Sequence, residues 1–200
     1  KNFCPDLTDE ELKQARFKLD AAGVRLLTFS LPAMPGDEAG CRKLFEFGRK
    51  MGIEAFISDP APEALNTIGK FCDEYRINMA LRGQDRTAAS RYVSPEAVLR
   101  ACEGRTARIG ACVDLGPWLR AGIDPVQAVR KLKQRVIAVI PGDMNEPGAG
   151  KTGEFLKELR ALGIQPAMIG LEQALPDASS TTGIARSIEC FNVLSRDLAK

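Results

Sequence analysis

Residues 108–114, Arg-Ile-Gly-Ala-Cys-Val-Asp, form a short and almost wholly apolar run that ends in an acidic residue. Runs of this kind, without strict alternation of apolar and polar residues, are typical of strands buried on both faces, as in a parallel sheet. Similar runs lie before and after it, at residues 24–31, 53–58, 77–81, 135–140 and 166–171. The sequence therefore predicts about six buried strands.

Helix signals stand before and between these runs. Thr8, followed three residues later by Glu11, is a capping box, and it predicts a first helix that stops at Gly23. Further helices are predicted at residues 37–50, 63–75, 94–104, 124–134, 152–162 and 181–200. Strands that alternate with helices in this way make βαβ units and a parallel sheet.

This alternation fits two α/β architectures. A (β/α)8 barrel has eight strand–helix units and usually about 250 residues. The present chain has 200 residues and opens with a helix that no strand precedes. We therefore expect one domain over residues 1–200 of the (β/α)8 TIM-barrel type, N-terminally incomplete, lacking its first strand, first helix and second strand. The alternative, a complete doubly wound sheet, favours a Gly-rich loop after its first strand, and residues 31–36, Leu-Pro-Ala-Met-Pro-Gly, are not one.

The chain contains no histidine. This excludes Ser-His and Cys-His nucleophile pairs and every zinc site that needs histidine. The six cysteines show no Cys-x-x-Cys spacing, so we expect them to be reduced, buried and apolar in character. A metal would have to be held by carboxylates, carbonyls, water or thiolates.

The charge balance does not favour a polyanionic partner. Lys and Arg number 28 and Asp and Glu 26, for a formal net charge of +2, so neither nucleic acid nor an anionic membrane is expected as a partner. No run of about 18 apolar residues predicts a membrane span. No signal peptide is visible, which favours the cytoplasm, although a chain that begins at Lys1 leaves room for a removed leader.

In either architecture, functional side chains gather where parallel strands end. The polar residues that stand at or just after the predicted strand ends are Asp59, Arg82, Gln84, Asp85, Asp114, Asp143 and Glu172.

The order of these motifs resembles the sugar phosphate isomerase/epimerase family, the xylose isomerase-like TIM barrels. The resemblance covers nearly the whole chain and is clearest at residues 45–60, 108–114, 122–125 and 188–191. Members of that family hold a divalent metal (Mn, Co, Zn or Mg) at their strand ends. The metal polarises a sugar carbonyl while a carboxylate moves the proton of the neighbouring carbon. The resemblance thus implies a sugar or sugar phosphate as the ligand.

Carried over position by position, the resemblance keeps only two metal-ligand positions, Asp114 and Glu172. Arg82 and Ile140 replace the other two, and Pro117 stands where the Asp-x-Gly-His signature has its histidine. A guanidinium stays protonated at any relevant pH. We therefore expect Arg82 to take the cation's position beside the two acids, with no metal of the family type and no other cofactor. The plainer interpretation is a buried acid pair that Arg82 satisfies.

Residues 145–152, Asn-Glu-Pro-Gly-Ala-Gly-Lys-Thr, look like a nucleotide phosphate loop, but Asn145 stands where that motif has its first glycine. A Gly-rich turn at a helix N-terminus nevertheless offers backbone N–H groups to an anion. Trp118 is a candidate to stack on a sugar, or else a packing residue. The candidate substrate-binding residues are Asp59, Gln84, Trp118, Asp143, Gly148, Gly150 and Lys151.

Two functions remain open from the sequence. The first is an isomerase or epimerase that works without a metal, with Glu172 or Asp59 as the base, Asp114 beside them and Arg82 as the electrophile. The second is a non-catalytic barrel that binds a carbohydrate-like ligand or a partner. A barrel that lacks two strands would also expose an unpaired sheet edge, through which a homodimer could form.

Overall fold

A computed structural model describes residues 3–83, 90–141 and 149–171, together with 185, 188–189, 191–193 and 196. Within them, six strands form one parallel sheet, and their order in the sheet is their order in the chain. The strands are β1 (Thr28–Ser30), β2 (Ala55–Ser58), β3 (Asn78–Leu81), β4 (Ile109–Asp114), β5 (Val136–Ile140) and β6 (Met168–Ile169). A doubly wound sheet reverses its strand order at a switch point. Because this sheet has no reversal, the partial-barrel prediction is confirmed and the doubly wound alternative is wrong.

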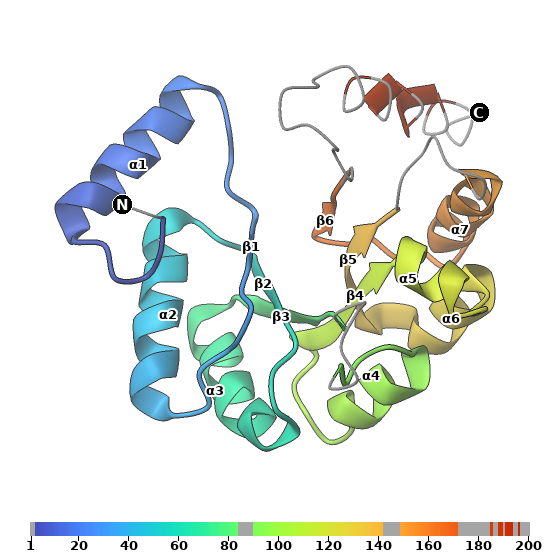
Figure 1. The fold of residues 1–200 in the computed structure, drawn as a ribbon, viewed down its shortest axis with the longest axis horizontal. Coiled ribbons are helices and arrows are strands. Elements are labelled where there is room, and N and C mark those ends of the chain that lie inside the picture. Colours follow the sequence, from blue (N-terminus) through green and yellow to red (C-terminus); the bar gives the residue numbers. More distant parts are fainter. Residues whose placement is uncertain are drawn as a thin grey trace.

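The helices lie along the outside of the curved sheet (Figure 1). They are α1 (Asp9–Ala21), α2 (Glu38–Met51), α3 (Leu65–Tyr75), α4 (Pro95–Cys102), α5 (Leu115–Arg120), α6 (Pro125–Leu132) and α7 (Ala149–Ala161), with single 3-10 turns at η1 (Pro62–Ala64) and η2 (Lys133–Arg135). The capping box of Thr8 and Glu11 is present at the start of α1, as predicted. Asp37 and Ser94 cap α2 and α4 through their side chains.

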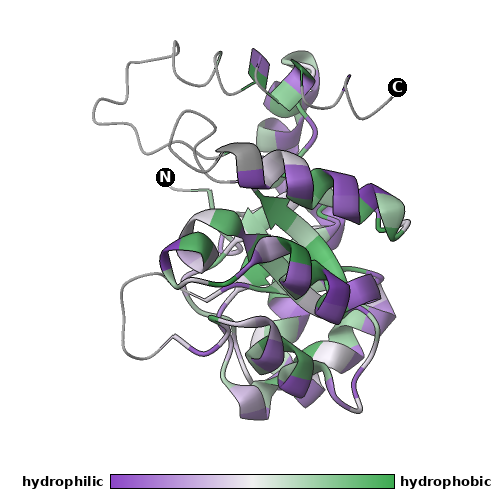
Figure 2. Ribbon diagram, turned by 90° about the vertical axis from the view of Figure 1, so that its right-hand side faces the viewer, coloured by the Kyte–Doolittle hydropathy of each residue, from purple (hydrophilic) through white to green (hydrophobic). Residues whose placement is uncertain are grey.

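Two apolar layers lie on the two faces of the sheet. The larger one fills the space between the sheet and its helices and includes Phe45, Phe56, Ile109 and Phe155. The smaller one covers the inner face and consists of Ala55, Ile57, Ala80, Cys112, Ile137, Ala138 and Ile140. Figure 2 shows the apolar strands in the middle and the hydrophilic residues on the helices. Strands buried on both faces explain why the sequence shows continuous apolar runs.

The sheet curls far enough to bring side chains of its first and last strands together. The Thr28 hydroxyl on β1 donates a hydrogen bond to the Met168 sulfur on β6, at 3.0 Å. Met168 also packs against the inner apolar layer. The inner face is therefore the interior of a curled, barrel-like sheet.

The structure differs from the sequence predictions mainly at element ends. β1 and β6 are shorter than the predicted runs 24–31 and 166–171. Each of the two pairs with only one neighbour in the described sheet, so fewer backbone bonds hold it in strand geometry. α5 was not predicted at all, and α7 begins at Ala149, before the predicted residue 152. Of the last predicted helix, residues 185, 188–189, 191–193 and 196 are described and are helical.

No helix in the described part of the chain is long and apolar enough to cross a bilayer.

Candidate functional site

The carboxyl ends of β2, β3 and β4 carry polar residues on the inner side of the sheet. Ile57, Ala80 and Cys112 belong to the inner apolar layer. Side chains of a strand alternate between its faces with a period of two. The residues two positions further on, Asp59, Arg82 and Asp114, therefore continue the inner face at the edge where the strands end.

Arg82 and Asp114 form the central contact of this edge. The Nε and Nη2 atoms of Arg82 both donate to Oδ2 of Asp114, at 2.9 and 2.6 Å. The side chain of Asp114 is only 9% exposed, and that of Arg82 is 26% exposed. The backbone N–H of Arg82 donates to the carbonyl of Ser58 at 3.0 Å, which fixes the start of the loop that Arg82 opens. A short, charge-assisted contact of this kind orients the guanidinium.

The described residues around Asp114 offer few donor groups of the kind that hold a metal in the resembled family. Ile140, which the resemblance puts at a ligand position, pairs with Asp114 in the strand register and is buried, and it offers no donor atom. The sequence has no histidine, and no group of three acids or cysteines suited to a metal ion occurs within the residues that the structure describes. A guanidinium 2.6 Å from Asp114 Oδ2 is also a poor neighbour for a divalent cation.

Asp59 lies at the end of β2, but its carboxylate faces protein and not solvent. Oδ2 accepts hydrogen bonds from the Ser90 hydroxyl and from the Arg91 backbone N–H, both at 3.2 Å. The side chain is 7% exposed, and the Arg91 Nη1 atom lies 3.6 Å from Oδ1. Nothing in the sequence pattern predicted these partners, because they come from a different loop, after β3.

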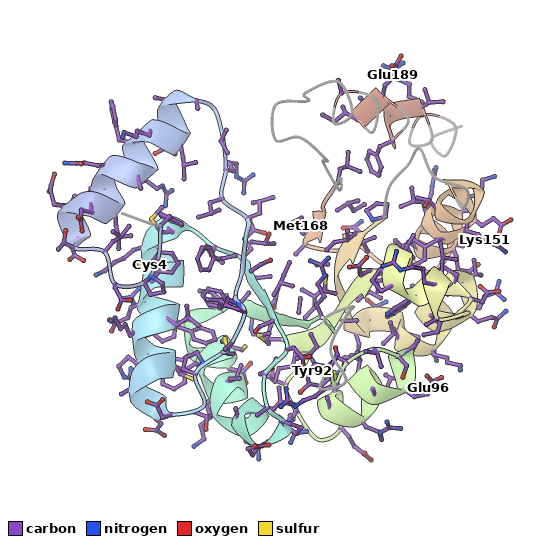
Figure 3. The ribbon with its side chains drawn as sticks, viewed as in Figure 1. Cys4, Tyr92, Glu96, Lys151, Met168 and Glu189 are labelled. Atoms are coloured by element: carbon purple, nitrogen blue, oxygen red, sulfur yellow. The ribbon has the colours of Figure 1, made fainter. Side chains whose placement is uncertain are left out.

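Of the remaining predicted residues, the structure describes Trp118, Gly150 and Lys151. Trp118 on α5 is 3% exposed and packs in the outer apolar layer. Lys151 is exposed on α7, where it pairs with Glu154 at 3.3 Å (Figure 3). Gly150 belongs to the first turn of the same helix. The Thr152 hydroxyl, which would hold a metal in a nucleotide loop, donates instead to the carbonyl of Pro141. Glu172, Gln84, Asp85, Asp143 and Gly148 lie outside the described residues.

A second guanidinium near Asp114 was not predicted. A Cβ atom on Gly116 would lie 3.4 Å from Nη1 of Arg120 and 3.8 Å from Oδ1 of Asp114. Arg120 therefore folds back over the first turn of α5 toward the same acid. Because no pattern in the sequence predicts α5, the spacing of Gly116 and Arg120 carried no signal there.

Comparisons with known proteins support the fold. No protein-family model matches the chain, and no curated protein does. Among solved structures, an uncharacterized protein from Parabacteroides distasonis is 24% identical, with a TM-score of 0.76, and the match covers 96% of this chain and 79% of that one. A sugar phosphate isomerase/epimerase from the same organism is 12% identical, with a TM-score of 0.71, over 94% of this chain and 77% of its own. The IolI protein, crystallised with a bound zinc atom, is 13% identical, with a TM-score of 0.63, over 95% and 82%. The chain thus has the fold of the xylose isomerase-like barrels.

Proposed function

We propose that the protein binds a sugar or sugar phosphate at the carboxyl end of its sheet and moves a proton beside the sugar carbonyl, as an isomerase or epimerase that uses Arg82 in place of a metal. The observation that carries the proposal is the double contact from Arg82 to Asp114 Oδ2. It puts a fixed positive charge at the strand ends of a fold that sugar isomerases and epimerases share.

The proposed chemistry needs an electrophile and a base. When a base removes the proton from the carbon next to a carbonyl, negative charge develops on the carbonyl oxygen, and fixed donors at that oxygen stabilise the enediolate. Arg82 is the donor in our proposal, because its guanidinium is charged at any relevant pH and is partly exposed to a ligand. Asp114 holds it in place.

Glu172 is the proposed base, which removes the proton and, in an isomerisation, returns it to the neighbouring carbon. An epimerisation also needs a second acid that donates a proton from the opposite face. Gln84, Asp143, Gly148, Gly150 and Lys151 are proposed to line the substrate, whereas Trp118, buried in the outer apolar layer, is a packing residue. A phosphate on the sugar would be bound at the start of α7, where Gly150 and Lys151 lie in the first turn.

The proposed mechanism needs no metal ion. Metal-dependent relatives need three or four ligands at this edge, whereas the described residues offer Asp114 beside a guanidinium and Ile140. Metal dependence is thus a direct test. Activity in the presence of excess EDTA should equal activity without it, and added Mn²⁺ should not increase it.

The main experiment follows loss of carbon-bound protons by NMR when a panel of ketoses, aldoses and their phosphates is incubated with the protein in D₂O. We expect one class of sugar to exchange, and Arg82→Met and Glu172→Gln to abolish the exchange. Arg130→Met is the matched control, since Arg130 also pairs with an acid, Glu158, but on the helix layer outside the sheet.

Exchange that survives in Arg82→Met, or that depends on an added divalent cation, would overturn the metal-free mechanism. Sugar binding without any proton exchange would favour the non-catalytic barrel instead. The double change Arg82→His and Ile140→His tests the assignment of positions. It should create affinity for Zn²⁺ or Co²⁺, measured by calorimetry, if these residues occupy the ligand positions of the resembled family.

A further inference from the structure

We infer that Asp59 is a positioning residue, which holds residues 90–92 against Gly83 and thereby fixes the place of Arg82. The inference rests on the proposed function only because it takes Arg82 as the residue that binds the ligand. The series of contacts from Asp59 to Arg82 involves described residues alone.

The first step is the carboxylate of Asp59. Its Oδ2 atom accepts from the Ser90 hydroxyl and the Arg91 backbone N–H, both at 3.2 Å, so one oxygen holds two successive residues. Its Oδ1 atom is buried and accepts no hydrogen bond in the described structure. The Arg91 Nη1 atom lies 3.6 Å from Oδ1 and also donates to the Asp59 carbonyl at 3.4 Å. With a side chain that is 7% exposed, this carboxylate is directed to residues 90 and 91 and is not open to a substrate.

Tyr92 adds a further contact between the segment after β2 and residues 90–92. The Tyr92 hydroxyl donates to the carbonyl of Pro60 at 2.7 Å, and Tyr92 is 3% exposed. Figure 3 shows Tyr92 close to the start of α4. Asp59 and Pro60, two successive residues after β2, therefore hold Ser90, Arg91 and Tyr92, which lie after β3 and before α4.

The second step is the contact of residues 90–92 with Gly83. A Cβ atom on Gly83 would lie 2.9 Å from the Ser90 hydroxyl oxygen and 2.9 Å from the carbonyl carbon and oxygen of Tyr92. The two backbone segments thus touch, and only glycine fits there. Gly83 follows Arg82 directly, and the Arg82 N–H is bonded to Ser58 on the other side. Arg82 is held from both sides, and one of the two supports depends on Asp59.

The test observes Arg82 without any ligand. In ¹⁵N-labelled protein, the Nε–H signal of Arg82 is assigned by its loss in Arg82→Lys. Since this Nε donates to Asp114, the signal should exchange slowly with water. In Asp59→Ala we expect the signal to shift and its exchange to be about tenfold faster. Asp59→Asn, which keeps an oxygen acceptor for Ser90 and Arg91, should restore most of the protection.

The Nε–H signal of Arg130, paired with Glu158 at 2.7 Å, is the internal control and should not move. Circular dichroism and the thermal midpoint check that the variants fold. If Asp59→Ala does not fold, Ser90→Ala and Tyr92→Phe each remove one tie and should each shift the Arg82 signal less. An unchanged Arg82 signal in a folded Asp59→Ala variant, or in both single-tie variants, would overturn the inference.

The two proposals fail separately. If the Arg82 signal responds to Asp59 but Arg82→Met still exchanges sugar protons, the positioning inference stands and the proposed function is wrong. If Arg82→Met abolishes the exchange of sugar protons while the Arg82 Nε–H signal is unchanged in Asp59→Ala, the proposed function stands and the inference is wrong.

Discussion

Two arginines at opposite ends of the sheet are used in different ways. Arg135 lies just before β5, at the amino end, and its Nη1 and Nη2 atoms donate to four backbone carbonyls at 2.6 to 3.3 Å. The acceptors are the carbonyls of Cys102, Arg105, Thr106 and Ile109. Arg82, at the carboxyl end, directs two donors to one carboxylate oxygen of Asp114.

The two guanidinium groups differ in whether a ligand could compete with their hydrogen-bond acceptors. Carbonyls of the chain cannot leave Arg135 without unfolding the turn between α4 and β4, so this guanidinium serves stability. The partner of Arg82 is a side chain, and Arg82 is partly exposed, so its charge can be shared with a bound anion or a developing oxyanion. The amino end of a barrel contributes mainly to stability and the carboxyl end to function.

The largest expected effect tests the amino end. A Cβ atom on Gly110 would collide with the carbonyl oxygen of Arg135, at the irregular register between β4 and β5. Gly110→Ala should therefore lower the free energy of unfolding by about 3 kcal/mol, measured by urea denaturation. Gly69→Ala is the control, because its Cβ would meet Ile109 at an ordinary 3.4 Å, and alanine in a helix such as α3 stabilises by up to about 1 kcal/mol. Equal losses in the two variants would contradict this account.

Arg135→Met comes next. It leaves several carbonyls without a donor, and we expect a loss of about 2 kcal/mol in urea denaturation. Arg25→Met, which removes an exposed arginine paired with Glu54, should cost at most about 0.5 kcal/mol. Sugar affinity of the folded Arg135→Met protein should equal that of the unchanged protein. A fall in affinity comparable to that in Arg82→Met would show that the two ends are not separate in function.

A double-mutant cycle on Arg82 and Asp114 sharpens the comparison at the carboxyl end. With Arg82→Met, Asp114→Asn and the double variant, we expect a coupling free energy of about 1 to 2 kcal/mol, because the acid is nearly buried while the guanidinium is partly exposed. The same cycle on Arg25 and Glu54, whose side chains are 80% and 46% exposed, should give about 0.5 kcal/mol or less. Similar values for both pairs would mean that Arg82 and Asp114 are an ordinary surface pair.

These predictions depend on features that the sequence revealed unevenly. The six strands and their parallel order follow from apolar runs separated by capped helices, and the meeting of Arg82 with Asp114 follows from their places at neighbouring strand ends. The helix α5 was missed because Gly116 and Pro117 are ordinary loop residues, and proline is also compatible with the first turn of a helix. The tie from Asp59 to Ser90 and Arg91 was missed because the path of a loop depends on contacts between distant segments, which periodicity does not report.

The smallest expected effect concerns pH and separates the two ends once more. Burial, together with the charge of Asp59, raises the pKa of Tyr92 from its ordinary value of 10.0 to about 12. A phenol whose pKa is higher in the folded state adds stability below its unfolded pKa, and this stability is lost as the pH rises from 10 through 12. At about pH 8, Tyr92→Phe should have a lower free energy of unfolding than the unchanged protein, because it lacks the hydrogen bond to the Pro60 carbonyl. At about pH 11 the difference in free energy of unfolding should be smaller, because the unchanged protein has by then lost part of the stability that Tyr92 contributes. Arg135→Met should show the same loss of stability at both pH values, since the backbone carbonyls that Arg135 contacts do not titrate. If the loss of stability in Tyr92→Phe is the same at both pH values, the pKa of Tyr92 is not raised by its buried surroundings. The hydrogen bond from Tyr92 to Pro60 would then be weaker than its length indicates.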